Sequence, residues 1–344
     1  MRILKMLMVV TIITTVTFSC KRTDDDFPTG TTAQSDRVEL YATSNTTGNI
    51  TVYDVKEIEN VTFNTHTTGS SDTEGLSYNI ATDELTFTSR SAGTLSTVEA
   101  ISQIEASAPY VPSILSASVL VSPRDVTARA GFYVVSDNSD VDGDPMTDDG
   151  RFFIFERSGE SYILRNTVTV DFAVWGIQFV GSSLVAVVDK TSDIAIFNSF
   201  TANNQTDDVA IPSKRITIAG LTRTHGIGFN GSAVVLTDIG DASNDIDGGF
   251  HVIDNFTAVL ENIDTGGTLS LENQVRVAGP STQLGNPVSA AYDGTTNTVY
   301  IAERANTSGR ILAFRDIPTT GGDVAPTYSS QLAGASSVLL YRGN

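Results

Sequence analysis

Short segments in which apolar residues alternate with polar ones recur along the chain from about Arg37 onward. Three stretches share one plan, and they open at Gly176, Gly226 and Val288. Their second segments are Ser183–Asp189, Ser232–Asp238 and Asn297–Glu303, and their third segments are Asp193–Phe197, Gly249–Asp254 and Gly309–Phe314. β-Branched and aromatic residues dominate these segments, and Gly, Asn and Asp bound them, so each segment predicts a β-strand.

A fourth strand with a shared ending closes each of these units. The segments are Ile216–Gly220, Val275–Gly279 and Gln331–Gly334, and their final glycines lie 59 and 55 residues apart. Four antiparallel strands repeated at about this period predict the blades of a β-propeller. Two earlier units fit less closely. One opens with Gly75–Tyr78 and Glu84–Phe87, and the other consists of Ser116–Leu120, Phe132–Val135 and Arg151–Phe155.

The two ends of the repeat region complement each other. Ser337–Tyr341 is an opening strand with nothing after it, whereas Arg37–Tyr41 and Asn49–Tyr53 are middle strands with nothing before them. Joined, they complete a blade, close the ring and leave no free sheet edge. We therefore predict an all-β fold, a six-bladed β-propeller over residues 37–344. A β-sandwich is the competing architecture, but it does not explain the complementary ends. Only Val98–Ile104 has a helix-like pattern.

The first 19 residues have the layout of a secretory signal peptide. Arg2 and Lys5 precede an apolar run over residues 6–18, and Ser19 precedes Cys20, the only cysteine of the chain. Residues 17–20 resemble a lipobox, and this resemblance implies that Cys20 is acylated and holds the protein in a membrane. The alternative is an ordinary secreted protein with a stray cysteine.

Residues 20–36 are polar, include three consecutive aspartates at 24–26, and predict a disordered tether. The acidic start of this segment is similar to signals that direct lipoproteins of Gram-negative bacteria outward. We therefore expect an outer-membrane or cell-surface location. The 40 acidic against 21 basic residues give a formal charge of −19, which repels phosphate backbones and argues against nucleic acid as a partner. We expect a monomer.

The repeat region resembles six-bladed propellers of the NHL and gluconolactonase-like kind. Val299–Glu303 followed by Gly309–Phe314 is similar to their sequence of strand, loop, glycine and strand. The motifs are degenerate, so the resemblance supports a fold more strongly than an activity.

An acidic loop between two predicted strands is a candidate calcium site. Its oxygen-bearing residues alternate and end at the twelfth position, and they are Asn138, Asp140, Asp142, Asp144 and Asp149. With Gly143 at the turn, this spacing resembles an EF-hand-type loop that wraps Ca²⁺. The alternative is a solvated turn. The acidic loop at Asp241–Asp247 lacks a metal spacing and predicts a solvated turn.

A second candidate site lies where the opening strands begin. Glu74, Trp175, His225 and Asn286 occupy matching positions just before these strands, so we expect all four at the mouth of the central channel. In a four-stranded antiparallel blade, the loop between strands two and three lies on this same face. Trp175, the only tryptophan, is either a platform on which sugars stack or a packing residue.

The family resemblance implies roles for the residues at the mouth. Glu74 and Asn286 would hold a Ca²⁺ ion that polarises a lactone or ester carbonyl, and His225 would be the general base. The other ligand positions of such enzymes correspond to Ser113, Trp175 and Ser336 here. A histidine at a blade start is more often a structural, hydrogen-bonded residue. We therefore favour a module that binds a glycan, peptide or protein, ahead of a calcium-assisted lactonase or esterase or a structural subunit of an envelope assembly.

Overall fold

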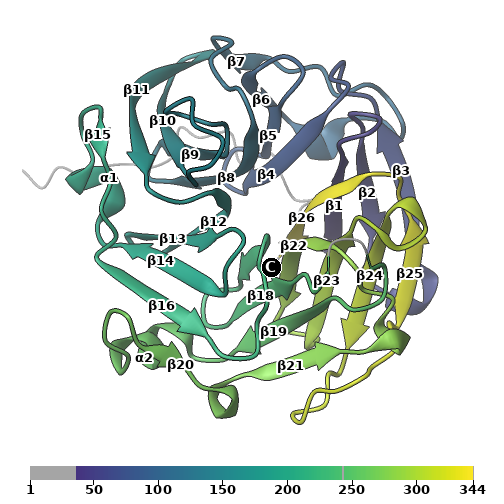
Figure 1. The fold of residues 1–344 in the computed structure, drawn as a ribbon. Coiled ribbons are helices and arrows are strands. Elements are labelled where there is room, and N and C mark those ends of the chain that lie inside the picture. The colour runs from purple at the N-terminus through teal and green to yellow at the C-terminus, as the bar shows by residue number, and fades with distance from the viewer. Residues whose placement is uncertain (1–35, 242–243, 344) are drawn as a thin grey trace, which may run out of the picture.

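The computed structural model describes residues 36–241 and 244–343. The signal segment, Cys20 and the tether up to residue 35 lie outside the described residues, so the predictions made for them stay predictions. The described chain is almost entirely β-structure, arranged as sheets around a common centre (Figure 1). This arrangement confirms the all-β propeller. No helix within the described part of the chain is long and apolar enough to cross a bilayer.

The strands form groups of four antiparallel neighbours, ordered from the centre of the ring outward. The group that joins the two ends consists of β26 (Ala335–Arg342), β1 (Val38–Ser44), β2 (Ile50–Asp54) and β3 (Thr62–His66). The next two are β4 (Thr73–Asn79), β5 (Glu84–Ser89), β6 (Thr94–Val98) and β7 (Ile114–Ser116), then β8 (Pro123–Arg129), β9 (Phe132–Asp137), β10 (Gly150–Ser158) and β11 (Ser161–Val170).

The remaining groups repeat this order. They are β12 (Val174–Val180), β13 (Ser183–Val188), β14 (Asp193–Phe197) and β16 (Lys214–Ile218), then β17 (Ile227–Phe229), β18 (Val234–Asp238), β19 (Gly249–Ile253) and β21 (Val275–Ala278), and finally β22 (Pro287–Asp293), β23 (Thr298–Glu303), β24 (Arg310–Arg315) and β25 (Tyr328–Gln331). Two short strands, β15 (Asp208–Val209) and β20 (Thr268–Leu269), pair in parallel with β11 and β16.

Hydrogen bonding alone divides the described strands into five sheets. A short parallel pairing of β7 with β11 joins two of the groups into one sheet of nine strands. Dividing this sheet at that pairing gives six groups of four strands, and the number of six blades stays a prediction. Among the described residues, helical structure is confined to α1 (Phe200–Asn203), α2 (Phe256–Glu261) and the 3₁₀ turns Ile58–Asn60, Ile101–Gln103, Leu271–Asn273, Pro280–Thr282 and Asn306–Ser308.

The ring closes as the complementary ends predict. β26, from the end of the chain, pairs antiparallel with β1 from Val38 opposite Arg342 to Ser44 opposite Ala335 (Figure 1). The last strand of the sequence is therefore the innermost strand of the group that contains the first three strands. This pairing ties the two ends together without a covalent link and covers what would otherwise be an exposed sheet edge.

Two segments differ from the predicted elements. Ser116–Leu120 is not an opening strand, because β7 ends at Ser116 as the outer strand of its group and β8 opens the next group. β8 looks too polar for a central strand, but Asp125 and Thr127 accept hydrogen bonds from the backbone of β12 in the next group. The second difference is at Val98–Ile104, where β6 ends and a 3₁₀ turn follows.

Alternating residues of the middle strands pack against different neighbours. On β13, Leu184, Ala186 and Val188 belong to an apolar cluster shared with β9, β10 and β11. Val185 and Val187 belong to a second cluster, shared with β18 and α2. Because side chains on a strand point alternately to opposite faces, this middle strand is apolar throughout its length, and each group packs against both neighbours. The apolar core therefore lies between the blades. The polar side chains that could contact a ligand lie at the ends of the strands.

Candidate functional site at the mouth of the channel

The innermost strands share an irregularity at their first residues. The pairing of β4, β8, β12, β22 and β26 with the neighbouring strand shifts register near its start, so that two residues lie opposite one. Such a β-bulge bends a strand and re-aims its side chains. The first residues of these bulges are Glu74, Arg124, Trp175, Val288 and Ser336. His225 takes the same place before β17, since the following Gly226 bonds with Thr237.

Three of the four residues predicted at the mouth are therefore equivalent. Glu74, Trp175 and His225 occupy matching positions, but Asn286 lies two residues ahead of its matching position, which Val288 fills. Ser113 does not begin an opening strand, and Arg124 stands at that position instead. Sequence reasoning missed Arg124 because Pro123, Arg124 and Asp125 lack the apolar alternation of a strand.

Trp175 is the middle layer of a stack of three side chains. The guanidinium carbon of Arg124 lies 4.1 Å from the centre of the Trp175 rings. On the other side, the His225 ring is nearly parallel to Trp175, with centroids 3.8 Å apart and an angle of 9° between the planes. Cation–π attraction and ring stacking hold this arrangement. Both faces of the indole are covered, so Trp175 is a packing residue and not a platform for a sugar.

The side chain of His225 is held in place by Asp189, which also forms an ion pair with Arg223. Its Nε2 lies 3.0 Å from Oδ1 of Asp189, and Arg223 donates to both oxygens of the same carboxylate at 2.7 and 3.2 Å. Burial raises the pKa of Asp189, but hydrogen bonds from His225 and Arg223 outweigh it, and the pKa lies below its usual range. Asp189 is therefore ionised at neutral pH.

Burial also determines the protonation of His225. It lowers the pKa of His225 against the opposing effect of Asp189, so the imidazole is neutral at pH 7. Because ionised Asp189 can only accept, Nε2 of His225 carries the proton and donates. The other nitrogen, Nδ1, is a buried acceptor with no hydrogen-bond partner among the described residues. The lowered pKa makes the imidazole a weak base, so His225 is poorly suited to take a proton from a substrate.

Glu74 already has cationic partners. Its Oε1 accepts a hydrogen bond from Nδ2 of Asn45 at 3.1 Å and lies 3.6 Å from Arg90 and 3.8 Å from Arg124. Burial raises the pKa of this carboxyl, and Arg124 opposes that effect. Two guanidinium groups this close would repel Ca²⁺. The donor set at Glu74 therefore does not fit the calcium site that the family resemblance implies.

Acidic residues at the ends of the second strands fasten the loops that lead into the mouth. Asp238 accepts hydrogen bonds from the backbone of Thr222 and Arg223 at 2.7 and 3.3 Å. Glu303 does the same for Gly285 and Asn286. These repeated acids, which end each strand signal in the sequence, are therefore structural. Asp189 is the exception, since it binds the side chains of Arg223 and His225.

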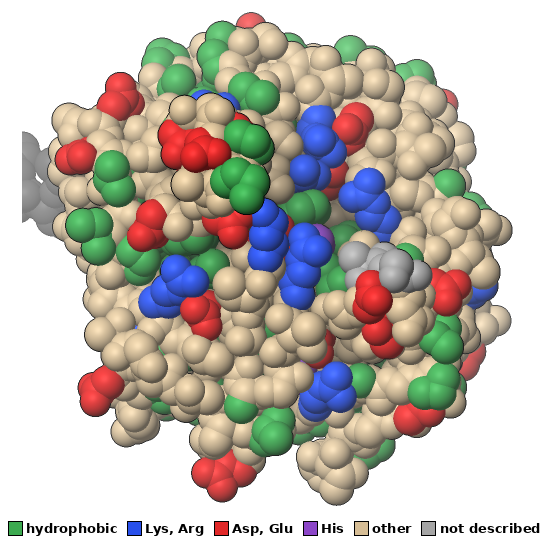
Figure 2. All heavy atoms as spheres, in the orientation of Figure 1, with side chains coloured by type: hydrophobic (Ala, Val, Ile, Leu, Met, Phe, Trp, Pro, Cys, Tyr) green, Lys and Arg blue, Asp and Glu red, His purple; other side chains and the backbone are tan. Residues whose placement is uncertain are grey.

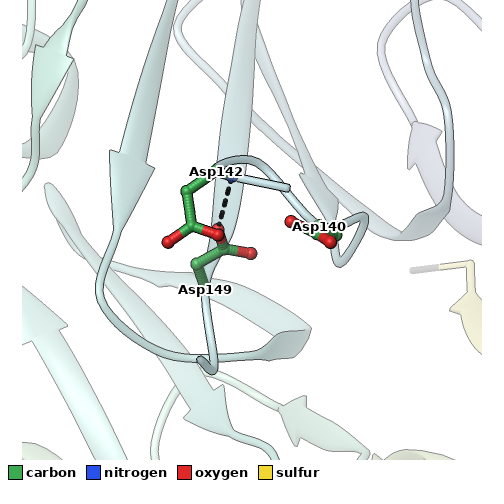
Figure 3. Close-up of side chains that lie close together, drawn as sticks. All are labelled: Asp140, Asp142 and Asp149. Atoms are coloured by element: carbon green, nitrogen blue, oxygen red, sulfur yellow. Dashed lines mark hydrogen bonds between the residues drawn. The ribbon is translucent and has the colours of Figure 1, made fainter. Parts of the chain in front are cut away.

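The acidic loop between β9 and β10 brings three of its five candidate ligands together. Asp140, Asp142 and Asp149 each offer an oxygen within 4.8 Å of the others (Figure 3). Asn138 is not part of this group, because its Oδ1 accepts hydrogen bonds from Ser122 and Arg124, both at 2.8 Å. Asp144 is also outside it and accepts from the backbone of Met146.

Backbone hydrogen bonds also shape this loop. Asp149 accepts from the amides of Val141 and Asp142, and Asp140 accepts from Gly143 (Figure 3 shows the bond between Asp142 and Asp149). Calcium binding here remains a proposal. The bond from Arg124 to Asn138 nevertheless places this loop on the same face as the start of β8, as the strand order predicted.

A cavity of about 670 Å³ occupies the central channel below the mouth. The innermost strands line it, and exposed residues at their far ends, such as Asn230 and Gly294, open it to the opposite face of the ring. Asp125, the second residue of the β8 bulge, is half-buried and borders this cavity. Burial raises its pKa to about 7. A neutral or half-ionised carboxyl therefore lies between the mouth and the cavity.

Comparison with known proteins supports the fold and does not assign a family. No protein-family model matches the chain, and no curated protein matches it. Many solved structures are similar in fold. A chain of a nidogen–laminin complex has a TM-score of 0.57 and 12% identity, with 88% of this chain and 98% of that chain covered.

Two bacterial structures are similar to the same extent. A Desulfotomaculum acetoxidans protein of unknown function has a TM-score of 0.55 and 13% identity, with 89% of this chain and 99% of that chain covered. A Bacteroides fragilis protein assigned provisionally as a 6-phosphogluconolactonase has a TM-score of 0.57 and 9% identity, covering 90% and 99%. The nidogen and the lactonase are propeller-like folds, and at these identities the likeness extends to the fold alone.

Proposed function

We propose that this protein is a lipoprotein of the Gram-negative cell envelope whose propeller binds a glycan, peptide or protein partner at the mouth of the channel. Cys20 would carry the lipid, and the segment up to residue 36 would hold the propeller away from the membrane. The arrangement of Arg124, Trp175 and His225 carries this proposal. It presents fixed polar groups to a ligand but provides neither an exposed base nor a set of metal ligands.

A calcium-assisted lactonase or esterase is the second candidate. One observation favours it: Nδ1 of His225 and Oδ1 of Asn286, which belong to two of its three proposed residues, are buried without a partner among the described residues. The fold likeness to a protein assigned as a lactonase is compatible with it. The guanidinium groups beside Glu74 and the offset position of Asn286 favour the binding role.

The two candidates differ in what they do to a ligand. We would screen the full-length protein in detergent against arrays of glycans and peptides, and measure hydrolysis of a panel of lactones and esters with Ca²⁺ and with chelator. Binding without turnover is the expected result. Calcium-dependent hydrolysis that is lost in Glu74→Gln would instead establish the enzyme.

The anchor is tested separately. Wild-type protein expressed in a Gram-negative host should fractionate with membranes and incorporate labelled fatty acid, whereas Cys20→Ala should do neither. Equal behaviour of the two proteins would refute the lipoprotein assignment and leave the binding proposal untouched.

A further inference from the structure

Four arginines from different parts of the ring gather at the mouth. Arg90 follows β5, Arg124 begins β8, Arg223 precedes β17 and Arg304 follows β23. Arg90 and Arg304 both act electrostatically on Arg124, while Arg223 and Arg124 both act on His225. Figure 2 shows basic side chains around the centre of this face, with a histidine among them. In a chain of net charge −19, this concentration of positive charge is a local feature that the overall composition does not predict.

Nearby carboxylates do not neutralise all of this positive charge. Asp189 is shared between Arg223 and His225, buried Glu74 is shared between Arg90 and Arg124, and Asp72 lies 3.6 Å from Arg90, so three carboxylates face four arginines. Arg304 makes no side-chain hydrogen bond or ion pair with any residue that the structure describes. Burial and the charge of Arg90 lower the pKa of Arg124 to about 10. The guanidinium groups therefore repel one another, and an anion placed between them would relieve that repulsion.

Hydrogen-bond acceptors without partners lie among these cations. Nδ1 of neutral His225 is one, and Oδ1 of Asn286 is another. Asn286 lies beside Arg304, whose backbone N–H donates to the Asn286 carbonyl at 3.0 Å. A fully ionised carboxylate offers no proton to such acceptors, whereas a hydroxyl group does. The mouth therefore combines sites for negative charge with sites for hydroxyl donors.

We propose that the mouth binds an anionic saccharide, whose carboxylate or phosphate lies among Arg124, Arg223 and Arg304 and whose hydroxyls face His225 and Asn286. This inference rests on the proposed binding function and names its ligand class. Guanidinium groups suit both kinds of acid because their planar donors match two oxygens at once. The sugar would approach the edge of the stack, since both faces of Trp175 are covered.

The only tryptophan of the chain lies in this stack, so its fluorescence reports binding without a label. We would titrate the full-length protein in detergent with digalacturonate, with glucose 6-phosphate, with a neutral disaccharide of galactose, and with acetate and inorganic phosphate alone. Calorimetry would confirm each affinity. Arg304→Gln is the test variant because its side chain supports no described contact. Arg129→Gln, an exposed arginine at the other end of β8, is the matched control.

At least one acidic sugar should alter the Trp175 fluorescence and bind at least tenfold more weakly to Arg304→Gln, with Arg129→Gln unchanged. Raising the salt concentration should weaken this binding. The two acidic sugars distinguish a carboxylate from a phosphate. Equal affinity for the neutral disaccharide would overturn the anionic ligand while leaving the proposed binding function in place. Equal affinity for acetate or phosphate alone would overturn the saccharide. If none of the sugars binds, the inference is wrong, and the peptide and protein partners of the proposed function remain to be tested by the arrays.

Discussion

The rings of Trp175 and His225 lie parallel, 3.8 Å apart, although 50 residues separate them in the sequence (225 minus 175). Trp175 is the first residue of the β12 bulge, and His225 takes the same place before β17. The two strands are neighbours around the ring, since the amide of Gly176 donates to the carbonyl of His225 at 2.9 Å. The glycine that follows Trp175 permits this closeness. A Cβ at Gly176 would lie 2.6 Å from the carbonyl oxygen of His225.

The stack should contribute measurably to stability. Trp175→Ala removes a ring pair and a cation–π contact, so we expect the free energy of unfolding to fall by roughly 2 kcal/mol. Trp175→Phe keeps an aromatic ring between Arg124 and His225 and should recover more than half of that loss. Urea denaturation followed by circular dichroism measures both, because neither variant retains a tryptophan. Equal losses in the two variants would show that the stacking geometry contributes little.

Asp125 should make the protein less stable as the pH rises from about 4 to 7. Its pKa in the folded state is about 7, above the value near 4 in the unfolded chain, so between these values the folded state binds the extra proton. Stability from this group is fully present below pH 4 and is lost as the pH passes 7. Each pKa unit corresponds to about 1.4 kcal/mol, so the loss is a few kcal/mol at most.

Asp125→Asn is the variant that isolates this effect. Asn keeps a carbonyl oxygen for the amide of Ile177 but cannot ionise. Urea unfolding at several pH values should show the variant gaining stability relative to wild type between pH 4 and 7. Parallel pH profiles for the two proteins would mean that the pKa of Asp125 is not raised.

Asp238 should contribute strongly to the stability of the blade formed by β17, β18, β19 and β21. It is 1% exposed, fastens the loop before β17 through two backbone amides and lies 3.3 Å from Arg276. Asp238→Ala leaves these donors unpaired and should cost about 3 kcal/mol of unfolding free energy. The exposed Asp254, at the end of β19, is a matched control, and its replacement by Ala should change stability by less than about 0.5 kcal/mol.

The stabilisation by Asp238 should also depend on pH. Burial raises the pKa of this carboxyl, but the His251 imidazole 3.5 Å away and hydrogen bonds from backbone amides outweigh that effect, so the pKa is lowered. A lowered pKa means stability that is present above the unfolded value near 4 and is lost as the pH falls through the folded value. The difference between wild type and Asp238→Ala should therefore shrink in acid. A difference independent of pH would assign the effect to packing.

The acidic loop should bind one Ca²⁺ ion weakly through the carboxylates of Asp140, Asp142 and Asp149. Calorimetry on the full-length protein should detect one site, with a dissociation constant on the order of 10⁻⁴–10⁻³ M. Asp142→Ala should abolish it, and Asp144→Ala should not, because Asp144 lies outside the cluster. Loss of the site in Glu74→Ala would place the metal at the mouth instead. Absence of binding in wild type would show that backbone hydrogen bonds alone hold the loop.

The amino-acid sequence by itself determined most of the strands, the repeat and the closure of the ring. Alternating apolar residues and turn residues are local signals, and a repeat period is visible without a structure. The unpaired strand signals at the two ends correctly predicted the pairing of β26 with β1. The strand order likewise placed the β9–β10 loop on the same face as the start of β8. The helices α1 and α2, of four and six residues, are too short for periodicity to reveal.

Only the tertiary structure decided what the mouth contains. Glu74, Trp175 and His225 were recognised because a glycine follows each of them, but β8 was missed because hydrogen bonds to the next blade, and not apolar alternation, stabilise it. Arg124 was missed with it. Asn286 was placed two residues too early, because Val288 and not Asn286 begins the bulge of β22. The arginine cluster joins residues from four parts of the chain, and closure of the ring brings them together. No local signal in the sequence encodes that proximity.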